Sequence, residues 1–355
     1  MMGETAIYGI SSIVGRLVNW VVLTPYLTRV FVSAEYGVIT ELFSYIAFLL
    51  VIFTYRMETA FFRFAGKKDE VHSADTVFTT ASIAVMGVTV LLTAILLLSA
   101  DPIAVWLKYP GKAHYVRLFV SIIALDALAA IPFARLRLDN RPFVFMFVKL
   151  AAIGLNIVLL FLFLEGCPWL LANGQEWVAA IYHPHDRIAY IFWANVLASG
   201  ATLLWLLPLY RGVVWRFAYD LWQRMLKYAL PLVLAGLAGI VNLLIGTPLL
   251  KYWGGGDIAA NLSMGGIYGA AAKLAVLMNL FVQAFNYAAE PFFFRQAGAS
   301  TDRAIFADTG RAFALAGSLA FLGIMLYLEV IQYFLGKEYR EGVGILPILL
   351  ISNFS

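Results

Sequence analysis

Long apolar runs separated by short polar segments recur along the whole chain. A run of about 20 apolar residues is long enough to cross a bilayer as an α-helix. We therefore expect nine complete spanning helices and the start of a tenth. The expected ranges are 6–29, 37–62, 77–99, 115–134, 143–164, 188–208, 228–250, 265–294, 312–335 and 344–355. The pattern predicts an all-α polytopic membrane protein with about ten transmembrane helices.

Composition supports this interpretation. Of the 355 residues, 62% are hydrophobic and only 13% are charged, whereas a soluble domain is nearer half apolar and a quarter charged. The excess apolar surface must face lipid, and a transmembrane β-barrel would instead show short alternating segments. The connecting loops are too short to fold as a soluble catalytic domain, so we do not expect an enzyme.

Lys and Arg are distributed unevenly between the two sides of the expected helices. Segments after even-numbered helices contain 14 of these residues, and segments after odd-numbered helices contain 8. Because cytoplasmic loops are enriched in Lys and Arg, this bias places the N-terminus in the cytoplasm. It also explains the net charge of +4 without nucleic acid as a partner. We expect a multi-pass membrane protein whose N-terminus is cytoplasmic.

Two segments of the chain have closely similar sequences. Residues 36–66 and 268–298 align without a gap and are identical at 11 of 31 positions. Upstream, Asn19 and Asn242 begin a second matching block, at an offset of 223 residues. The first two expected helices therefore correspond to the seventh and eighth. This spacing predicts a six-helix repeat whose two copies run parallel, related by an axis along the membrane normal.

The repeat sets the expected domain organisation. Residues 1–210 would form an N-lobe of helices 1–6, and residues 211–355 a C-lobe of helices 7–10. Two complete copies would need twelve helices, so we expect that helices 11 and 12 are missing and that the sequence is a fragment. The second copy also has a longer connection at 250–266, which we expect to be a loop.

Polar side chains inside a span are costly and usually face a cavity or a partner helix. Projected at about 100° per residue, such residues share one face on several expected helices. The functional interpretation is a water-filled cavity lined by helices 1, 2, 7 and 8. The alternative is hydrogen bonding between helices and extension of long side chains to the interface. The substrate-binding candidates are Ser12, Arg16, Asn19, Arg63, Lys149, Asn279, Gln283 and Asn286.

Four further charged residues are candidates for gating or coupling. Glu41 aligns with Lys273 in the repeat, so equivalent positions carry opposite charges. We hypothesise that these two side chains approach one another across the lobe interface as a latch. Glu58 aligns with Glu290, near the cytoplasmic ends of equivalent helices.

The sequence gives little support for a bound metal ion or cofactor. The four histidines all lie in expected loops, and the His-Pro-His run at 183–185 lacks a third ligand. The single Cys167 excludes an internal disulfide and a multi-cysteine metal site. We expect neither a metal site nor a cofactor. Asn261-Leu262-Ser263 fits a glycosylation sequon, a pattern that is common by chance.

Several blocks resemble a known family. They are SSIVGRLVNWVVLTPYLTRVFVSAEYGVITELFSY at 11–45, METAFFRFAGKK at 57–68 and IYGAAAKLAVLMNLFVQAFNYAAEPFFF at 267–294. These resemble polysaccharide-biosynthesis membrane proteins, the O-antigen-type oligosaccharide-lipid flippases, particularly Bacteroidetes-type members. The family belongs to the multidrug/oligosaccharidyl-lipid/polysaccharide (MOP) exporter superfamily.

The resemblance implies a V-shaped, MATE-like fold of two six-helix lobes around a central cavity. It implies transport of undecaprenyl-pyrophosphate-linked oligosaccharide across the bacterial inner membrane by alternating access, beside other polysaccharide-assembly membrane proteins. Coupling to H⁺ or Na⁺ is common in this superfamily. By resemblance, Arg16 falls where related flippases carry a cavity arginine. The chain departs from them at Arg56, where a glycine is frequent, at Gly246-Thr247, where an acidic-basic pair is frequent, and at Asn286, where a basic residue is frequent.

Three alternatives remain open at this point. A cation-coupled multidrug exporter of the same fold would carry acidic groups deep in its cavity, and Glu41 fits that expectation. A peptidoglycan-precursor flippase would share the mechanism and differ in head group. A membrane-embedded sugar polymerase or ligase would need a large outer loop with catalytic residues, which the sequence lacks.

Overall fold

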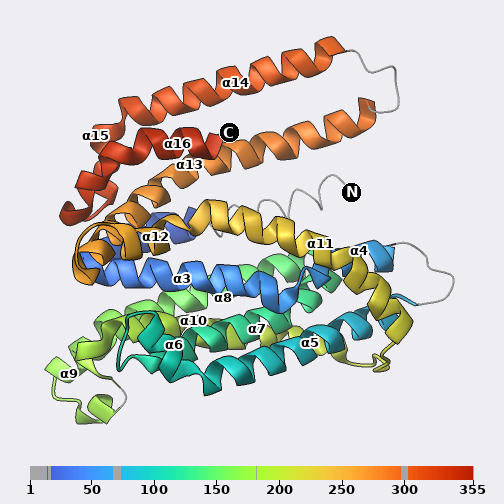
Figure 1. The fold of residues 1–355 in the computed structure, drawn as a ribbon, viewed down its shortest axis with the longest axis horizontal. Coiled ribbons are helices and arrows are strands. Elements are labelled where there is room, and N and C mark those ends of the chain that lie inside the picture. Colours follow the sequence, from blue (N-terminus) through green and yellow to red (C-terminus); the bar gives the residue numbers. More distant parts are fainter. Residues whose placement is uncertain (1–13, 15–16, 67–72, 181, 297–302, 355) are drawn as a thin grey trace. The chain divides into compact units, whose positions relative to one another are not determined.

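The computed structural model describes residue 14 and residues 17–66, 73–180, 182–296 and 303–354. All regular elements in these ranges are helices (Figure 1). Contacts divide the chain into two compact units. Unit 1 comprises Met1–Gly15 and Glu41–Ile245, and unit 2 comprises Arg16–Thr40 and Gly246–Ser355. The predicted lobes, divided at residue 210, follow helix number rather than contacts and stay a prediction.

Eight helices in the described part are long and apolar enough to cross a membrane. Several of them leave rows of large apolar side chains exposed, as lipid-facing helices do. On α14 (Arg303–Leu326) the row is Leu315, Leu319, Leu322 and Leu326, which are between 53% and 80% exposed. The all-α polytopic architecture is therefore confirmed.

Unit 1 contains most of the first copy of the repeat. Its helices are α3 (Ser33–Thr54, from Glu41 on), α4 (Met57–Gly66), α5 (Ala74–Leu98), α6 (Ala100–Trp106), α7 (Ala113–Leu138), α8 (Pro142–Phe161), α9 (Cys167–Ala172), α10 (Arg187–Leu206) and α11 (Tyr219–Leu244). One core cluster joins α4, α5, α7 and α11, with Phe61, Phe78 and Met225 fully buried. The ring centroids of Phe61 and Phe78 are 6.2 Å apart, edge to face.

The second expected helix, 37–62, is not continuous. It ends at Thr54 and restarts at Met57, and between them Tyr55 has φ 35° and Arg56 has φ 57°. This left-handed conformation is energetically unfavourable for an L-residue, whereas glycine adopts it without strain. The sequence pattern missed the break because apolar periodicity continues through it. A glycine at position 56 would adopt this conformation without strain.

We expect Arg56→Gly to be more stable than Arg56→Ala by about 1 kcal/mol, since glycine relieves the left-handed strain. Both variants lose the guanidinium, whose Cζ would lie 2.8 Å from a Cβ built at Gly236 of α11. The side-chain contribution therefore cancels in the comparison. Thermal unfolding in detergent measures the difference. The usual helix-interior order, in which alanine is the more stable, would show that position 56 is not strained.

Unit 2 contains the remaining helices. They are a π-helical turn η1 (Asn19–Leu23), α2 (Thr24–Val30), the first two turns of α3, α12 (Gly246–Trp253), α13 (Ile258–Gln296), α14, α15 (Leu328–Ile331), the 3₁₀ segment η7 (Lys337–Ile345) and α16 (Leu346–Phe354). Gly336, just before η7, donates its backbone N–H to Thr28 Oγ1 of α2 at 3.1 Å. Trp20 of η1 stacks on Phe334 with 4.7 Å between ring centroids. Segments from both ends of the sequence thus pack within one unit.

The long connection expected at 250–266 is mostly helical. Helix α12 runs to Trp253 and α13 begins at Ile258, so only Gly254–Asp257 links them. Asp257 accepts a hydrogen bond from the backbone N–H of Ala260 at 2.7 Å and thereby caps α13. The expectation of a loop was wrong. The three consecutive glycines indicate a loop, but the residues after them begin a capped helix.

Asn261 fixes this connection and is 3% exposed. Its amide nitrogen donates to the carbonyl oxygens of Lys251 at 3.0 Å and Gly256 at 3.2 Å. Its Oδ1 accepts from the backbone N–H of Gly256 at 3.0 Å. The side chain is fully used inside the fold, which removes the sequon at Asn261 as a glycosylation candidate in the folded protein.

Candidate functional site

The predicted cavity residues of the first helix fall largely beyond what the structure describes. Ser12 and Arg16 are outside the described ranges, and Asn19 is placed by its backbone alone, in η1. Gln283, Asn286 and Glu290 lie on α13, and their side chains are likewise not described. These assignments stay predictions.

Arg63 is the best-defined predicted cation. It is exposed on α4, and its guanidinium carbon lies 4.1 Å from the centre of the Tyr228 ring of α11. Within the described ranges no carboxylate lies within ion-pair distance of it. An arginine stacked on an aromatic ring keeps its hydrogen-bond donors available in a fixed plane. Beside it, the Arg137 guanidinium lies 4.7 Å from the ring centre of Phe62, also on α4.

Glu58 lies at the start of α4. Its Oε1 is 3.9 Å from Arg56 Nη1, at the edge of ion-pair range. Its Oε2 is buried and has no hydrogen-bond partner among the described residues. Burying a carboxylate oxygen without a hydrogen-bond partner costs free energy, so Glu58 destabilises the folded protein at this position. The predicted coupling residue thus occupies a polar site at the edge of the unit 1 core.

Lys149, a predicted substrate-binding residue, lies on α8 in unit 1, and its role stays a prediction. It is exposed on α8, and its Nζ sits 4.1 Å from the centre of the Phe133 ring of α7. In the described part of the chain it has no carboxylate within 4 Å, although Asp126 of α7 is near enough to interact electrostatically. Lysine commonly extends along apolar surface in this way, with its charge toward a polar layer.

Glu41 is fully buried in α3, and both of its oxygens are occupied. The hydroxyl of Tyr45, one turn further along, donates to Oε1 at 2.6 Å. The hydroxyl of Tyr109, which follows α6, donates to Oε2 through a short hydrogen bond. Sequence reasoning missed Tyr109, because nothing local indicates a contact 68 residues away.

Lys273 and Asn279 both lie on α13 in unit 2. Lys273 is exposed and Asn279 is half-buried. Glu41 belongs to unit 1, so the predicted latch between Glu41 and Lys273 stays a hypothesis.

Within unit 2, the first turns of α3 and α13 cross through glycines. A Cβ at Gly37 would overlap the carbonyl of Leu262, lying 2.8 Å from its carbon, and would lie 3.3 Å from Gly266 N. A Cβ at Gly266 would lie 2.8 Å from Gly37 N and 3.0 Å from the carbonyl carbon of Ser33. Such close backbone approach is how membrane helices associate through small residues. We call this contact the glycine seam.

Polar contacts surround the glycine seam. The Ser33 hydroxyl is 2.6 Å from that of Ser263 and donates a short hydrogen bond to Glu338 of η7. The buried Tyr339 hydroxyl donates to the Phe31 carbonyl at 2.6 Å. Burial raises the pKa of Tyr339, so this donor keeps its proton at ordinary pH. Three segments of unit 2 are therefore held together at one end of α3.

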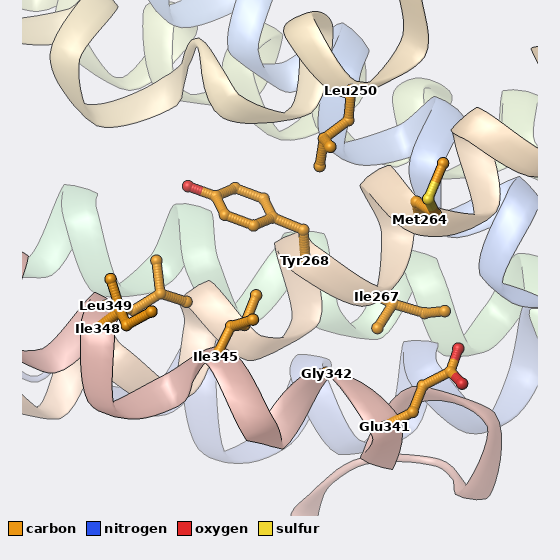
Figure 2. Close-up of a pocket in the computed structure, with 9 residues that line it drawn as sticks. All are labelled: Leu250, Met264, Ile267, Tyr268, Glu341, Gly342, Ile345, Ile348 and Leu349. Carbon is orange, nitrogen blue, oxygen red and sulfur yellow. The ribbon is translucent and has the colours of Figure 1, made fainter. Parts of the chain in front are cut away.

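A cavity of about 550 Å³ lies beside the seam, also within unit 2 (Figure 2). Its walls are almost wholly apolar and come from α12, α13, η7 and α16. The lining residues are Leu250, Met264, Ile267, Tyr268, Glu341, Gly342, Ile345, Ile348 and Leu349. Figure 2 shows the Tyr268 ring lying across the space and the Glu341 carboxylate at one edge.

Comparison with solved structures identifies the fold of the chain. No protein-family model matches the chain, and no curated protein sequence matches it. Among solved structures it is similar to an "inward-facing conformation of a multidrug resistance MATE family transporter of the MOP superfamily". The match has a TM-score of 0.56 at 16% identity, and covers 96% of this chain and 82% of that one.

The chain has the MATE transporter fold. This confirms the predicted fold class. Together with the eight apolar helices, it indicates a multi-pass membrane protein. At this identity the MATE fold by itself does not select a substrate, so the cargo must be argued from the residues of the site.

Proposed function

We propose that this protein is an exporter that moves undecaprenyl-pyrophosphate-linked oligosaccharide across a bacterial inner membrane by alternating access. The MATE fold supports export, and the resemblance of residues 11–45, 57–68 and 267–294 to oligosaccharide-lipid flippases supports the cargo. The N-terminus would be cytoplasmic, as the Lys and Arg bias predicts.

The environment of Arg63 is the observation that most supports this cargo. Its guanidinium is exposed, is oriented by the Tyr228 ring and has no acidic partner within the described part of the chain. Arg56 and Arg137 flank the same short helix, so positive charge is concentrated on α4. A pyrophosphate group is recognised by planar guanidinium donors of this kind. The lipid tail can stay in the bilayer while the head group crosses.

The glycine seam suits alternating access. In the predicted topology, residues 31–36 and the connection before α13 both face the outside. The seam and its surrounding hydrogen bonds would then close the outer end of unit 2. Opening to the outside would require these contacts to separate, and small residues make such a contact tight without large apolar side chains to expose.

A lipophilic-cation exporter of the same fold is the second candidate. The unit 2 cavity favours it, because an aromatic ring at Tyr268 and a carboxylate at Glu341 are groups that bind a hydrophobic cation. Glu341 would repel a pyrophosphate. The two candidates therefore use different sites, Arg63 in unit 1 and Tyr268 in unit 2.

Reconstituted protein tests the cargo directly. We expect vesicles containing the wild type to translocate a fluorescent lipid-linked oligosaccharide. Arg63→Ala should slow this by about tenfold or more, as expected for the loss of charge-assisted hydrogen bonds worth roughly 1.5 to 3 kcal/mol. Arg224→Ala is the matched control, since this exposed arginine of α11 already pairs with Asp220 at 3.4 Å.

The same vesicles separate the two candidates. If the wild type moves a fluorescent lipophilic cation and not the oligosaccharide lipid, the cargo proposed here is wrong. In that case Tyr268→Ala, and not Arg63→Ala, should reduce transport.

A further inference from the structure

The segment between α10 and α11 presents basic and large apolar side chains together. Helix α10 ends at Leu206 and α11 begins at Tyr219. We call residues 211–219 the linker strip. Its exposed members are two arginines and four large apolar side chains, namely Arg211, Val214, Trp215, Arg216, Phe217 and Tyr219. The four apolar side chains are between 42% and 79% exposed.

Buried hydroxyl groups of α5 fix the backbone of the linker strip. Thr79 Oγ1 donates to the Arg216 carbonyl at 2.8 Å, and Thr80 Oγ1 accepts from the Ala218 N–H at 3.1 Å. Both threonines are fully buried in unit 1. Because these backbone groups are satisfied on the side that faces α5, the strip holds its exposed side chains on the opposite side.

Aromatic stacking orients Trp215 in the same way. Its ring centroid lies 5.2 Å from that of Tyr210, and the two planes differ by 13°. Tyr210 in turn stacks on Phe78 of α5 with 5.0 Å between centroids, and its hydroxyl donates to Ser82 Oγ at 3.2 Å. One face of the indole is therefore covered by a ring that packs on the unit 1 core, and the remainder is exposed.

The arginines of the linker strip carry positive charge that no acidic side chain compensates in the part of the chain that the structure describes. No carboxylate there lies within ion-pair distance of Arg211 or Arg216. Asp220, which directly follows the strip, pairs with Arg224 at 3.4 Å. An anionic group can therefore bind both guanidinium groups without displacing a protein carboxylate.

The linker strip connects two membrane spans. Pro184–Tyr210 and Tyr219–Leu244 are both long and apolar enough to cross a bilayer, so the residues between them lie near the lipid head groups. Exposed leucines continue on both sides, including Leu204 of α10 and Leu234 of α11. The apolar part of the strip thus extends the lipid-facing surface. In the predicted topology this end of the two helices faces the cytoplasm.

We propose that the linker strip binds an anionic phospholipid of the cytoplasmic leaflet, with Arg211 and Arg216 on its phosphate. Guanidinium groups donate charge-assisted hydrogen bonds to phosphate oxygens. Tryptophan and tyrosine favour the membrane–water interface, where one part of the ring is apolar and the other is wet. The proposal goes beyond export, and it uses none of the residues to which we assign the cargo.

A lipid fits this surface better than a soluble acidic partner does. Basic residues beside a spanning helix are attracted to the negative surface potential of anionic lipids. A soluble polyanion would satisfy the two arginines but leave four large apolar side chains in water, whereas a bilayer interface covers both kinds of group. A lipid that binds only the folded protein also stabilises it.

Fluorescence quenching on the full chain in vesicles tests the position of the linker strip. Trp215→Phe removes one of nine tryptophans, so the difference between wild-type and variant emission is the Trp215 signal. In phosphatidylcholine vesicles, brominated phosphatidylglycerol should quench this signal at a mole fraction about tenfold or more below that needed with brominated phosphatidylcholine. Each cation near an anionic surface accounts for about fivefold of this preference, the factor for about 1 kcal/mol.

Arg211→Ala/Arg216→Ala should abolish the preference for the anionic lipid, measured again as the difference made by Trp215→Phe. Arg117→Ala/Arg224→Ala is the matched control. It removes the same charge, but each of these arginines already pairs with an aspartate, at 3.3 Å and 3.4 Å. The control should keep the wild-type preference. Equal losses in the two double variants would reduce the effect to net charge and overturn the proposal.

Thermal unfolding checks that the arginine variant is folded and that the lipid binds it less. In phosphatidylcholine alone, we expect Arg211→Ala/Arg216→Ala to unfold at the wild-type temperature, because both side chains are exposed. Added phosphatidylglycerol should raise the midpoint for the wild type and not for this variant. An equal rise in both would place the anionic site elsewhere and overturn the proposal.

The orientation of the linker strip has its own contrary result. A Trp215 signal that neither brominated lipid quenches would show that the strip faces water, and it too would overturn the proposal. Because no cargo is present in these vesicles, every outcome is independent of whether the protein carries lipid-linked oligosaccharide.

Discussion

Gly37→Ala is expected to destabilise the protein by about 2 kcal/mol, because its Cβ would force two backbones apart. The atoms in the way are the Leu262 carbonyl and Gly266 N of α13, which cannot rotate aside as a flexible side chain would. Glycine to alanine inside a helix ordinarily gains roughly 0.5 to 1 kcal/mol. The expected sign is therefore the reverse of the usual one. The midpoint of thermal unfolding in detergent measures it.

Gly87→Ala supplies the matched control. Gly87 also lies inside a long helix, α5, but a Cβ there would meet nothing within 4 Å. We expect this variant to unfold at the same temperature as the wild type or slightly above. If Gly37→Ala is stabilised to the same extent, α3 and α13 do not meet through their backbones, and the glycine seam cannot close one end of unit 2.

Asn261→Leu is expected to cost about 3 kcal/mol or more, because a buried group left without its hydrogen bond costs roughly 1 to 3 kcal/mol. The Asn261 amide now bonds to the Lys251 and Gly256 carbonyls and to the Gly256 N–H. The change removes these three hydrogen bonds. Leucine is similar in size, so lost packing contributes little. Thermal unfolding, together with protease cleavage near 254–257, measures the effect.

Asn261→Asp refines this prediction. The carboxylate keeps an acceptor for the Gly256 N–H and loses both donors, so it should also be strongly destabilising. Asn173→Leu is the control, since Asn173 is exposed and its side-chain amide donates a hydrogen bond to the Trp169 carbonyl at 2.7 Å. Equal losses at positions 173 and 261 would mean that the connection between α12 and α13 does not depend on Asn261.

The fold class followed from the sequence because lipid imposes a simple rule on composition. Every spanning segment must be a long apolar helix, so counting such runs recovers the architecture. Breaks inside helices are harder to see. The interruption at Tyr55 and Arg56 depends on backbone angles, and arginine is a poor indicator of a left-handed residue. Helix α13 begins earlier than the sequence pattern predicts, because Asp257 caps it directly after three glycines.

The candidate site was only partly accessible to the same reasoning. Helical projection identified Glu41 and Arg63, because a charged residue inside a spanning helix is energetically costly and therefore conspicuous. It could not find their partners. Tyr109 and Tyr228 are aromatic residues in an aromatic-rich chain, and only tertiary contacts show that they orient a carboxylate and a guanidinium.

The glycine seam also bears on the symmetry of the two repeat copies. With the repeat offset of 232 residues, Gly269 is equivalent to Gly37. Gly266 meets Ser33 and Gly37, and a Cβ at Gly269 would lie 2.9 Å from Thr40 Cγ2, so each helix meets the other near its own equivalent position. Self-complementary contact of this kind is what a two-fold symmetric homodimer uses. The seam thus has the near-two-fold, self-complementary geometry of a homodimer interface, here formed between two segments of one polypeptide.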